Sequence, residues 1–185
     1  EDSAVKAAAE AIRSGRKTAL LLGGRALREP ALLEAARIAA HNGVTLFAET
    51  FPTRIERGAG LPPVERIAYL AELATLQLSE FDHLILVDAK APVSFFAYPG
   101  KQSYLVPDNC TAHTLSTPEQ DATTSLKKLA DTLGASNAQP KLQAPGRPGL
   151  PKGKLTAEKV CRAVGELMPE NSIIVDEAIT SGLML

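Results

Sequence analysis

The chain has 185 residues, a formal net charge of −1 and 45% hydrophobic residues, so it is long enough to bury a sizeable core. Because no basic run appears and the net charge is small, we expect no nucleic-acid partner. No apolar run approaches the roughly 20 residues of a membrane-spanning helix, and no signal peptide is visible, so we expect a cytoplasmic protein with no membrane partner. Cys110 and Cys161 lack metal-ligand spacing, which predicts two reduced thiols and no metal site.

The first part of the chain alternates short apolar runs with longer amphipathic segments, the pattern of a parallel sheet covered by helices. Strands are predicted over 19–22, 44–48, 84–87, 104–106 and 111–115. Helices are predicted over 3–14, 30–42 and 118–133, the last with Thr117 as its N-cap, and a further helix begins between 64 and 71 and ends at 78. The sequence therefore predicts a Rossmann-like α/β fold with helices on both faces of the sheet.

Two long loops interrupt this alternation, at 50–63 and 88–100. Loops of this length are uncommon unless they are functional or cover another part of the protein. The second loop contains Phe95, Phe96 and Tyr98, three of the eight Phe and Tyr residues in the chain. These rings could line a pocket, although such a cluster more often seals one end of a sheet.

The composition changes after residue 134. Residues 135–154 contain Pro140, Pro145, Pro148 and Pro151, which predicts an extended linker between domains 1–134 and 155–185. A helix over 156–168 and a strand over 173–175 then begin a second α/β domain, which stops after a few more residues. Together with the absence of a starting Met, this pattern leads us to expect a fragment of a longer polypeptide.

The turn after the first strand is the main candidate site of the sequence. Gly23, Gly24 and Arg25 lie where the phosphates of a nucleotide bind in parallel sheets, and Glu49 follows the second strand, where an acid would bind a ribose. The spacing of the glycines departs from the dinucleotide fingerprint, because Ala26 and Arg28 occupy later positions of that pattern. The sequence leaves three interpretations of this turn open: a nucleotide site, an anion pocket, or a turn that only allows close packing of strand and helix.

The order and spacing of several segments resemble the central domain of thiamine diphosphate-dependent enzymes of the acetolactate synthase and benzoylformate decarboxylase group. The segments are KTALLLGGRALREPALLEAARIAAHNGVTLFAET (17–50), RGAGLPP (57–63), FDHLILVDAKAP (81–92), the Pro/Gly linker and LTAEKVCRAVGELMPENSIIVDEAITSG (155–182). The resemblance implies that the chain is the middle domain of three and the beginning of the third, diphosphate-binding domain.

The same resemblance places residues 176–182 beside the cofactor diphosphate, with Thr180 and Ser181 as the expected binding residues of the parent enzyme. The alternative is that their hydroxyl groups only cap the next helix. The activating glutamate of the family belongs to the first domain and its glycine-aspartate-glycine Mg²⁺ motif to the third, and neither lies in this sequence. We therefore expect no catalytic residue and no metal ligand in this chain.

The resemblance implies a scaffolding role in a parent lyase or transferase that cleaves or ligates 2-oxo acids with thiamine diphosphate and Mg²⁺. The isolated chain is expected to be inactive and to bind no cofactor. In family members with FAD, an arginine-containing stretch follows the third strand, whereas here that stretch reads VDAKAPVSFFAYPG, which argues against FAD. Expected partners are other domains of the parent chain and further copies, as a dimer or tetramer. The alternative hypothesis is a free-standing FAD- or NAD-binding module.

Overall fold

Strand β1 (Thr18–Leu22) is the centre of a five-stranded sheet, and all of its residues are buried. It pairs in parallel with β2 (Thr45–Ala48) on one side and with β4 (His83–Val87) on the other. Its sequence, TALLL, contains no charged side chain, as expected for a strand covered on both faces. The structure, a computed structural model, describes residues 2–178, 180–182 and 184.

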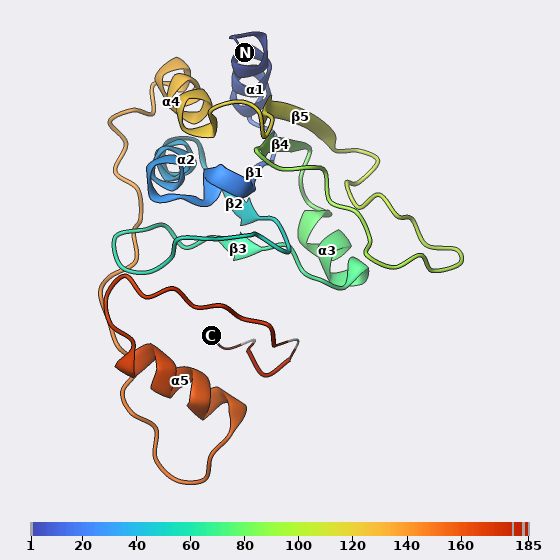
Figure 1. Ribbon diagram of the computed structural model, residues 1–185. Helices are drawn as coiled ribbons and strands as arrows, with labels where there is room; N and C mark the ends of the chain where they lie inside the picture. Colours follow the sequence, from blue (N-terminus) through green and yellow to red (C-terminus); the bar gives the residue numbers. More distant parts are fainter. Residues whose placement is uncertain (1, 179, 183, 185) are drawn as a thin grey trace. The chain divides into compact units, whose positions relative to one another are not determined.

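The strands follow the order β3-β2-β1-β4-β5, and every pair is parallel. The outer strands are β3 (Glu65–Arg66) and β5 (Thr111–Ser116). Because all strands run the same way, the turns that follow them gather at one edge, the carboxyl edge (Figure 1). The chain reverses its winding direction between β1 and β4, so the turn after β1 lies at the topological switch point.

Helices cover both faces of the sheet, which confirms the predicted fold class. Helices α1 (Asp2–Arg13), α2 (Glu29–Asn42) and α4 (Ala122–Leu133) pack on one face, against Leu20, Leu22 and Ile85. Helix α3 (Ala71–Leu78) packs on the other face, against Leu21 and Leu84. Alternate residues of each strand therefore enter separate cores, as the period of two in a strand requires.

Local capping explains where the helices begin and end. Pro30 lies in the first turn of α2, where a missing N–H costs nothing, and Gly43 ends the helix with φ +68°. The N-cap of α4 is Asp121, whose carboxylate accepts hydrogen bonds from the N–H groups of Thr123 and Thr124. The prediction of Thr117 as N-cap was wrong, because residues 118–121 form a turn ahead of the helix.

Two further predictions differ from the structure, and one strand was not predicted. The strand expected over 104–106 is reduced to one antiparallel bridge between Val93 and Tyr104. Instead, the two-residue strand β3, which the sequence did not reveal, forms the edge beside β2. The strand expected over 173–175 is absent from the described residues: Ile173, Ile174 and Val175 are exposed, without the neighbouring strand that a ladder requires.

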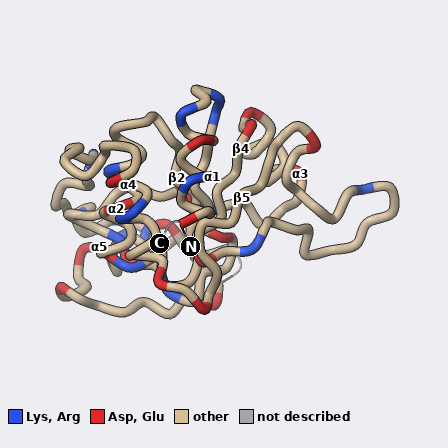
Figure 2. Tube along the Cα trace, turned by 90° about the horizontal axis from the view of Figure 1, so that it is seen from above, with Lys and Arg blue, Asp and Glu red and all other residues tan. Residues whose placement is uncertain are grey.

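The chain divides into two compact units, Glu1–Gln143 and Ala144–Leu185. The first contains the sheet and runs on past the predicted boundary at residue 134. The second contains α5 (Ala157–Leu167), for which the Thr156 hydroxyl accepts a hydrogen bond from the Lys159 N–H. Charges of both signs are distributed along the described chain, in keeping with its small net charge (Figure 2).

A pair of histidines lies at the amino-terminal end of the β4–β5 ladder. His113 Nε2 is 3.2 Å from His83 Nδ1. The register pairs His113 with Ile85, and His83 lies two residues before Ile85, so both rings point to the same face of the sheet. Burial, and secondarily the neighbouring His83, lowers the pKa of His113 from 6.5. The folded protein therefore favours the neutral form of this ring.

We expect replacement of Leu20 by Ala to destabilise the protein by about 2–5 kcal/mol, because Leu20 is fully buried in the central strand and the change leaves a cavity. Urea unfolding followed by circular dichroism measures the loss. Leu76→Ala on α3 is the control; its side chain is 70% exposed, so we expect a change within about 0.5 kcal/mol. Equal losses for the two variants would contradict this assignment of the core.

We also expect stability to fall as the pH is lowered through the range just below 6.5. In this range the unfolded chain binds a proton at His113 more readily than the folded chain does, so stability rises again as the pH increases. Replacement of His113 by Gln should flatten the pH dependence of the urea midpoint between pH ~5 and ~7.5. His41→Gln is the matched control, in the last turn of α2; a His113→Gln curve as steep as that of the unchanged protein argues against the assignment.

Candidate functional site

The candidate site predicted from the sequence lies at the carboxyl edge, in the turn between β1 and the 3₁₀-helix η1 (Gly24–Leu27). Two acidic residues from neighbouring strand ends meet this turn: Glu49 directly follows β2, and Asp88 directly follows β4. The parallel sheet therefore brings together three segments that are far apart in the sequence. Sequence analysis pointed to the glycines and Glu49 but overlooked Asp88, although an acid directly after the buried run LILV was a usable signal.

Both carboxylates accept hydrogen bonds from the backbone of the turn. The Gly24 N–H donates to Glu49 Oε1 at 3.1 Å, and the Arg25 N–H donates to Asp88 Oδ2 at 2.7 Å. Asp88 is buried and has a φ of +50°, a left-handed conformation that is uncommon for a residue other than glycine. Asp88 therefore combines an uncommon backbone conformation with a buried carboxylate.

The side chain of Arg25 is also engaged within the chain. Its Nη2 donates to the carbonyl oxygens of Pro118 and Gln120, at 2.6 and 2.8 Å, and its Nε is 3.8 Å from Asp88 Oδ2. Arg25 therefore ties the turn after β1 to the segment that precedes α4. Gly23, Gly24 and Arg25 form this turn, and the anion pocket predicted from them stays a prediction.

A second set of contacts holds the loop 50–63 against the start of α2. Glu56 accepts hydrogen bonds from the Glu29 N–H at 2.5 Å and from Arg28 Nη1 at 3.2 Å. The bond from the Glu29 N–H, with a smaller contribution from Arg28, lowers the pKa of Glu56. A carboxylate at the N-terminus of α2 also suits the helix dipole. These contacts anchor one of the two long loops.

Both long loops contribute to a cluster of aromatic rings at the surface, which we call the aromatic cluster: Phe51, Tyr69, Phe95, Phe96 and Tyr98. Neighbouring ring centroids are 5.0–5.9 Å apart. Each side chain is between 41% and 62% exposed, so the rings contact one another without being covered. The cluster therefore combines both long loops and the residues just before α3 into one apolar surface.

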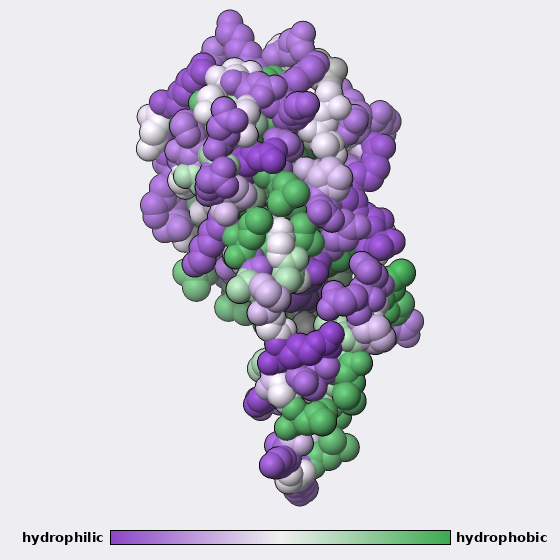
Figure 3. Space-filling model, turned by 90° about the vertical axis from the view of Figure 1, so that its left-hand side faces the viewer, coloured by the Kyte–Doolittle hydropathy of each residue, from purple (hydrophilic) through white to green (hydrophobic). Residues whose placement is uncertain are grey.

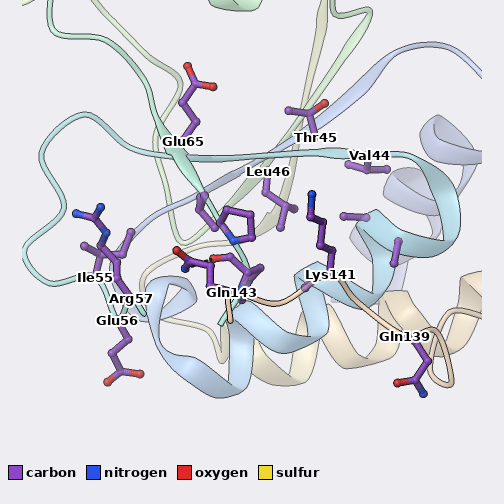
Figure 4. Close-up of a pocket in the computed structure, with 16 residues that line it drawn as sticks. Val44, Thr45, Leu46, Ile55, Glu56, Arg57, Glu65, Gln139, Lys141 and Gln143 are labelled. Carbon is purple, nitrogen blue, oxygen red and sulfur yellow. Dashed lines mark hydrogen bonds between the residues drawn. The ribbon is translucent and has the colours of Figure 1, made fainter. Parts of the chain in front are cut away.

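A pocket of about 710 Å³ lies beside α2 and β2 in the first unit (Figure 4). Its lining includes Val44, Leu46 and Ile55, and the segment 139–143 borders it. Gln143 fixes this segment through two backbone hydrogen bonds, to Gly60 and Leu61, both 2.9 Å long. Figure 4 shows the Glu56 carboxylate directed away from the pocket interior. Figure 3 shows hydrophobic residues gathered into patches between hydrophilic ones on one face of the molecule.

The second candidate site, over 176–182, belongs to the second unit. Thr180 and Ser181 are exposed, and the carbonyl oxygen of Ser181 accepts a hydrogen bond from the Cys161 thiol, with Sγ at 3.4 Å. Asp176 Oδ1 accepts from the Ala178 N–H at 2.9 Å. Ile179, within this stretch, lies outside the described residues. The turn is thus held against α5, and the roles of Thr180 and Ser181 stay predictions.

The described residues contain neither a metal-binding cluster nor a membrane-spanning helix. Within that part of the chain, no three His, Cys, Asp or Glu side chains lie together as metal ligands would. No helix there has both the length and the apolar character needed to cross a lipid bilayer.

Comparison with known proteins identifies related sequences and folds. Comparison with protein-family models gives no match. The chain is 48% identical over 174 residues to a Mycobacterium tuberculosis protein named acetolactate synthase large subunit IlvX, covering 94% of this chain and 33% of that protein. The chain thus spans about a third of the length of this relative.

Solved structures share the fold at low sequence identity. A thiamine diphosphate-dependent 4-hydroxybenzoylformate decarboxylase from Rhodococcus jostii matches 94% of this chain with 35% of its own, at 16% identity and a TM-score of 0.65. A thiamin diphosphate-dependent enzyme from Mycobacterium smegmatis matches 92% of this chain with 36% of its own, at 16% identity and a TM-score of 0.64. The resemblance predicted from the sequence is confirmed: the chain is homologous to one third of an acetolactate synthase-like large subunit and has a fold found in thiamine diphosphate-dependent enzymes.

Proposed function

We propose that this chain is the central scaffolding domain, with the beginning of the diphosphate-binding domain, of a thiamine diphosphate-dependent 2-oxo acid lyase or carboligase. The observation that carries the proposal is the 48% identity to an acetolactate synthase-like subunit over 94% of this chain but only 33% of the relative. By this proposal, the catalytic groups come from parts of the enzyme that lie outside these residues. The whole enzyme would be a cytoplasmic dimer or tetramer.

The aromatic cluster supports a role in contacting other domains or subunits. Val93, Leu70 and Leu73 lie within four residues of its rings along the chain, Tyr104 forms a β-bridge with Val93, and all four are about half exposed. At roughly 200 Å² for a large side chain, nine half-exposed side chains present on the order of 900 Å² of surface. One partner of a standard protein interface buries about 800 Å², so the area suits a stable contact. We infer that the rest of the parent enzyme covers this surface and that both long loops reach toward its substrate or a neighbouring subunit.

The cofactor would contact this chain only through the second unit. Thiamine diphosphate supplies an electron sink that stabilises a carbanion next to a carbonyl group. Thr180 and Ser181 are exposed residues, and their hydroxyl groups are chemically suited to donate hydrogen bonds to a diphosphate. These hydroxyl groups carry no charge for Mg²⁺, and the resemblance assigns the metal motif to a part of the third domain outside these residues.

A chimaera tests the proposal. This chain replaces the matching third of the Mycobacterium tuberculosis relative, and size-exclusion chromatography and thiamine diphosphate uptake with Mg²⁺ are measured. We expect a folded assembly that takes up the cofactor, and we expect Phe95→Ser/Tyr98→Ser to lower its melting temperature by several degrees, because the interface loses two rings.

Leu142→Ser is the matched control, since Leu142 is an exposed apolar residue outside the aromatic cluster. The melting temperature of this variant should stay close to that of the unchanged chimaera. The proposal is wrong if the chimaera assembles but takes up no thiamine diphosphate. The interface assignment is wrong if the Phe95→Ser/Tyr98→Ser variant has the same melting temperature as the control.

A further inference from the structure

The turn after β1 occupies the place where doubly wound parallel sheets bind the phosphates of nucleotides. Ligands bind there because backbone N–H groups at the switch point have no partner within the protein and attract an anion. The question for this chain is therefore whether the N–H groups of residues 23–26 are available to a ligand.

The outer two N–H groups of the turn have backbone partners. The Gly23 N–H donates to the carbonyl oxygen of Val87 at 3.0 Å, which extends the β1–β4 ladder by one bond. The Ala26 N–H donates to the carbonyl oxygen of Gly23 at 2.8 Å, within η1. Neither group is available to a phosphate.

The inner two N–H groups have carboxylates as partners. Gly24 donates to Glu49 and Arg25 donates to Asp88, at 3.1 and 2.7 Å. Hydrogen bonds from an N–H to an ionised acceptor are stronger than those to a neutral one, so they resist displacement. The chain thus supplies its own anions at the positions where a phosphate would accept these bonds.

The two glycines of the turn allow this close approach. A Cβ added at Gly24 would lie 2.6 Å from Asp88 Oδ2, and one added at Gly23 would lie 3.0 Å from Glu49 Oε1 and 2.4 Å from the carbonyl oxygen of Asp88. In a dinucleotide-binding turn, glycine leaves room for the pyrophosphate. Here the same room is filled by the side chain of Asp88, which is 5% exposed.

Arg25, the nearest cation, is also engaged, through the carbonyl oxygens of Pro118 and Gln120. A phosphate that entered the turn would meet two negative charges and no uncommitted backbone N–H among residues 23–26. We propose that Glu49 and Asp88 act as built-in anions that close the nucleotide position of this fold, so that neither FAD, NAD nor another nucleotide binds there. The residues of the turn do not fit an FAD diphosphate, and the turn instead locks β1, β2 and β4 together.

Amide NMR spectra of the ¹⁵N-labelled full chain test directly whether the nucleotide position is closed. We expect ADP or FAD at millimolar concentration to leave the amide signals of residues 23–26 unmoved. Asp88→Asn keeps the left-handed backbone, which Asn tolerates, but removes the charge, so we expect the Arg25 amide to exchange with solvent about tenfold faster. Glu10→Gln/Asp108→Asn is the control, because both of these acids are exposed and lie outside the turn.

A gain-of-binding variant gives a second, independent readout. Glu49→Ala/Asp88→Gly removes both carboxylates, and glycine accepts the φ of +50° at position 88. We expect pyrophosphate to raise the melting temperature of this variant but not that of the unchanged chain or the control. Saturable movement of the Gly24 and Arg25 amides of the unchanged chain with ADP or FAD would overturn the proposal, as would a folded double variant indifferent to pyrophosphate. If the double variant does not fold, the amide spectra of the unchanged chain decide.

Discussion

The burial of β1 between two parallel neighbours is the constraint on which the rest of this structure depends. A strand that is hydrogen-bonded along both edges and covered on both faces requires apolar residues throughout, and TALLL supplies them. Its alternate side chains enter two separate cores, so helices must cover each face. The position of β1 also sets the switch point, and with it the turn where Gly24 meets Glu49 and Asp88.

The carboxyl edge combines two kinds of surface. Near β1 it is closed by carboxylates that bind backbone N–H groups, whereas farther along the edge it presents half-exposed aromatic rings. The first arrangement makes the edge rigid, and the second leaves apolar area for a contact. Both properties fit the scaffolding role proposed above.

The sequence predicted the parts of the fold that depend on local pattern. The strands at β1, β2, β4 and β5 and the helix α2, with Pro30 and Gly43 at its ends, follow from periodicity and capping signals. The edge strand β3 has only two residues, too few for any period to appear. Asp88 was overlooked as a site residue because its role depends on a contact with Arg25, 63 positions away in the sequence, which only the assembled sheet creates.

Gln143 fixes the end of the first unit to the loop 50–63. It pairs with the backbone of Gly60 and Leu61 directly before the boundary at Ala144, and its side-chain amide also donates to the carbonyl oxygen of Gly58. The tether to the second unit therefore starts at the loop 50–63 and not at the end of α4. Tension on the tether would be borne first by this loop, which Glu56 fastens to the N-terminus of α2.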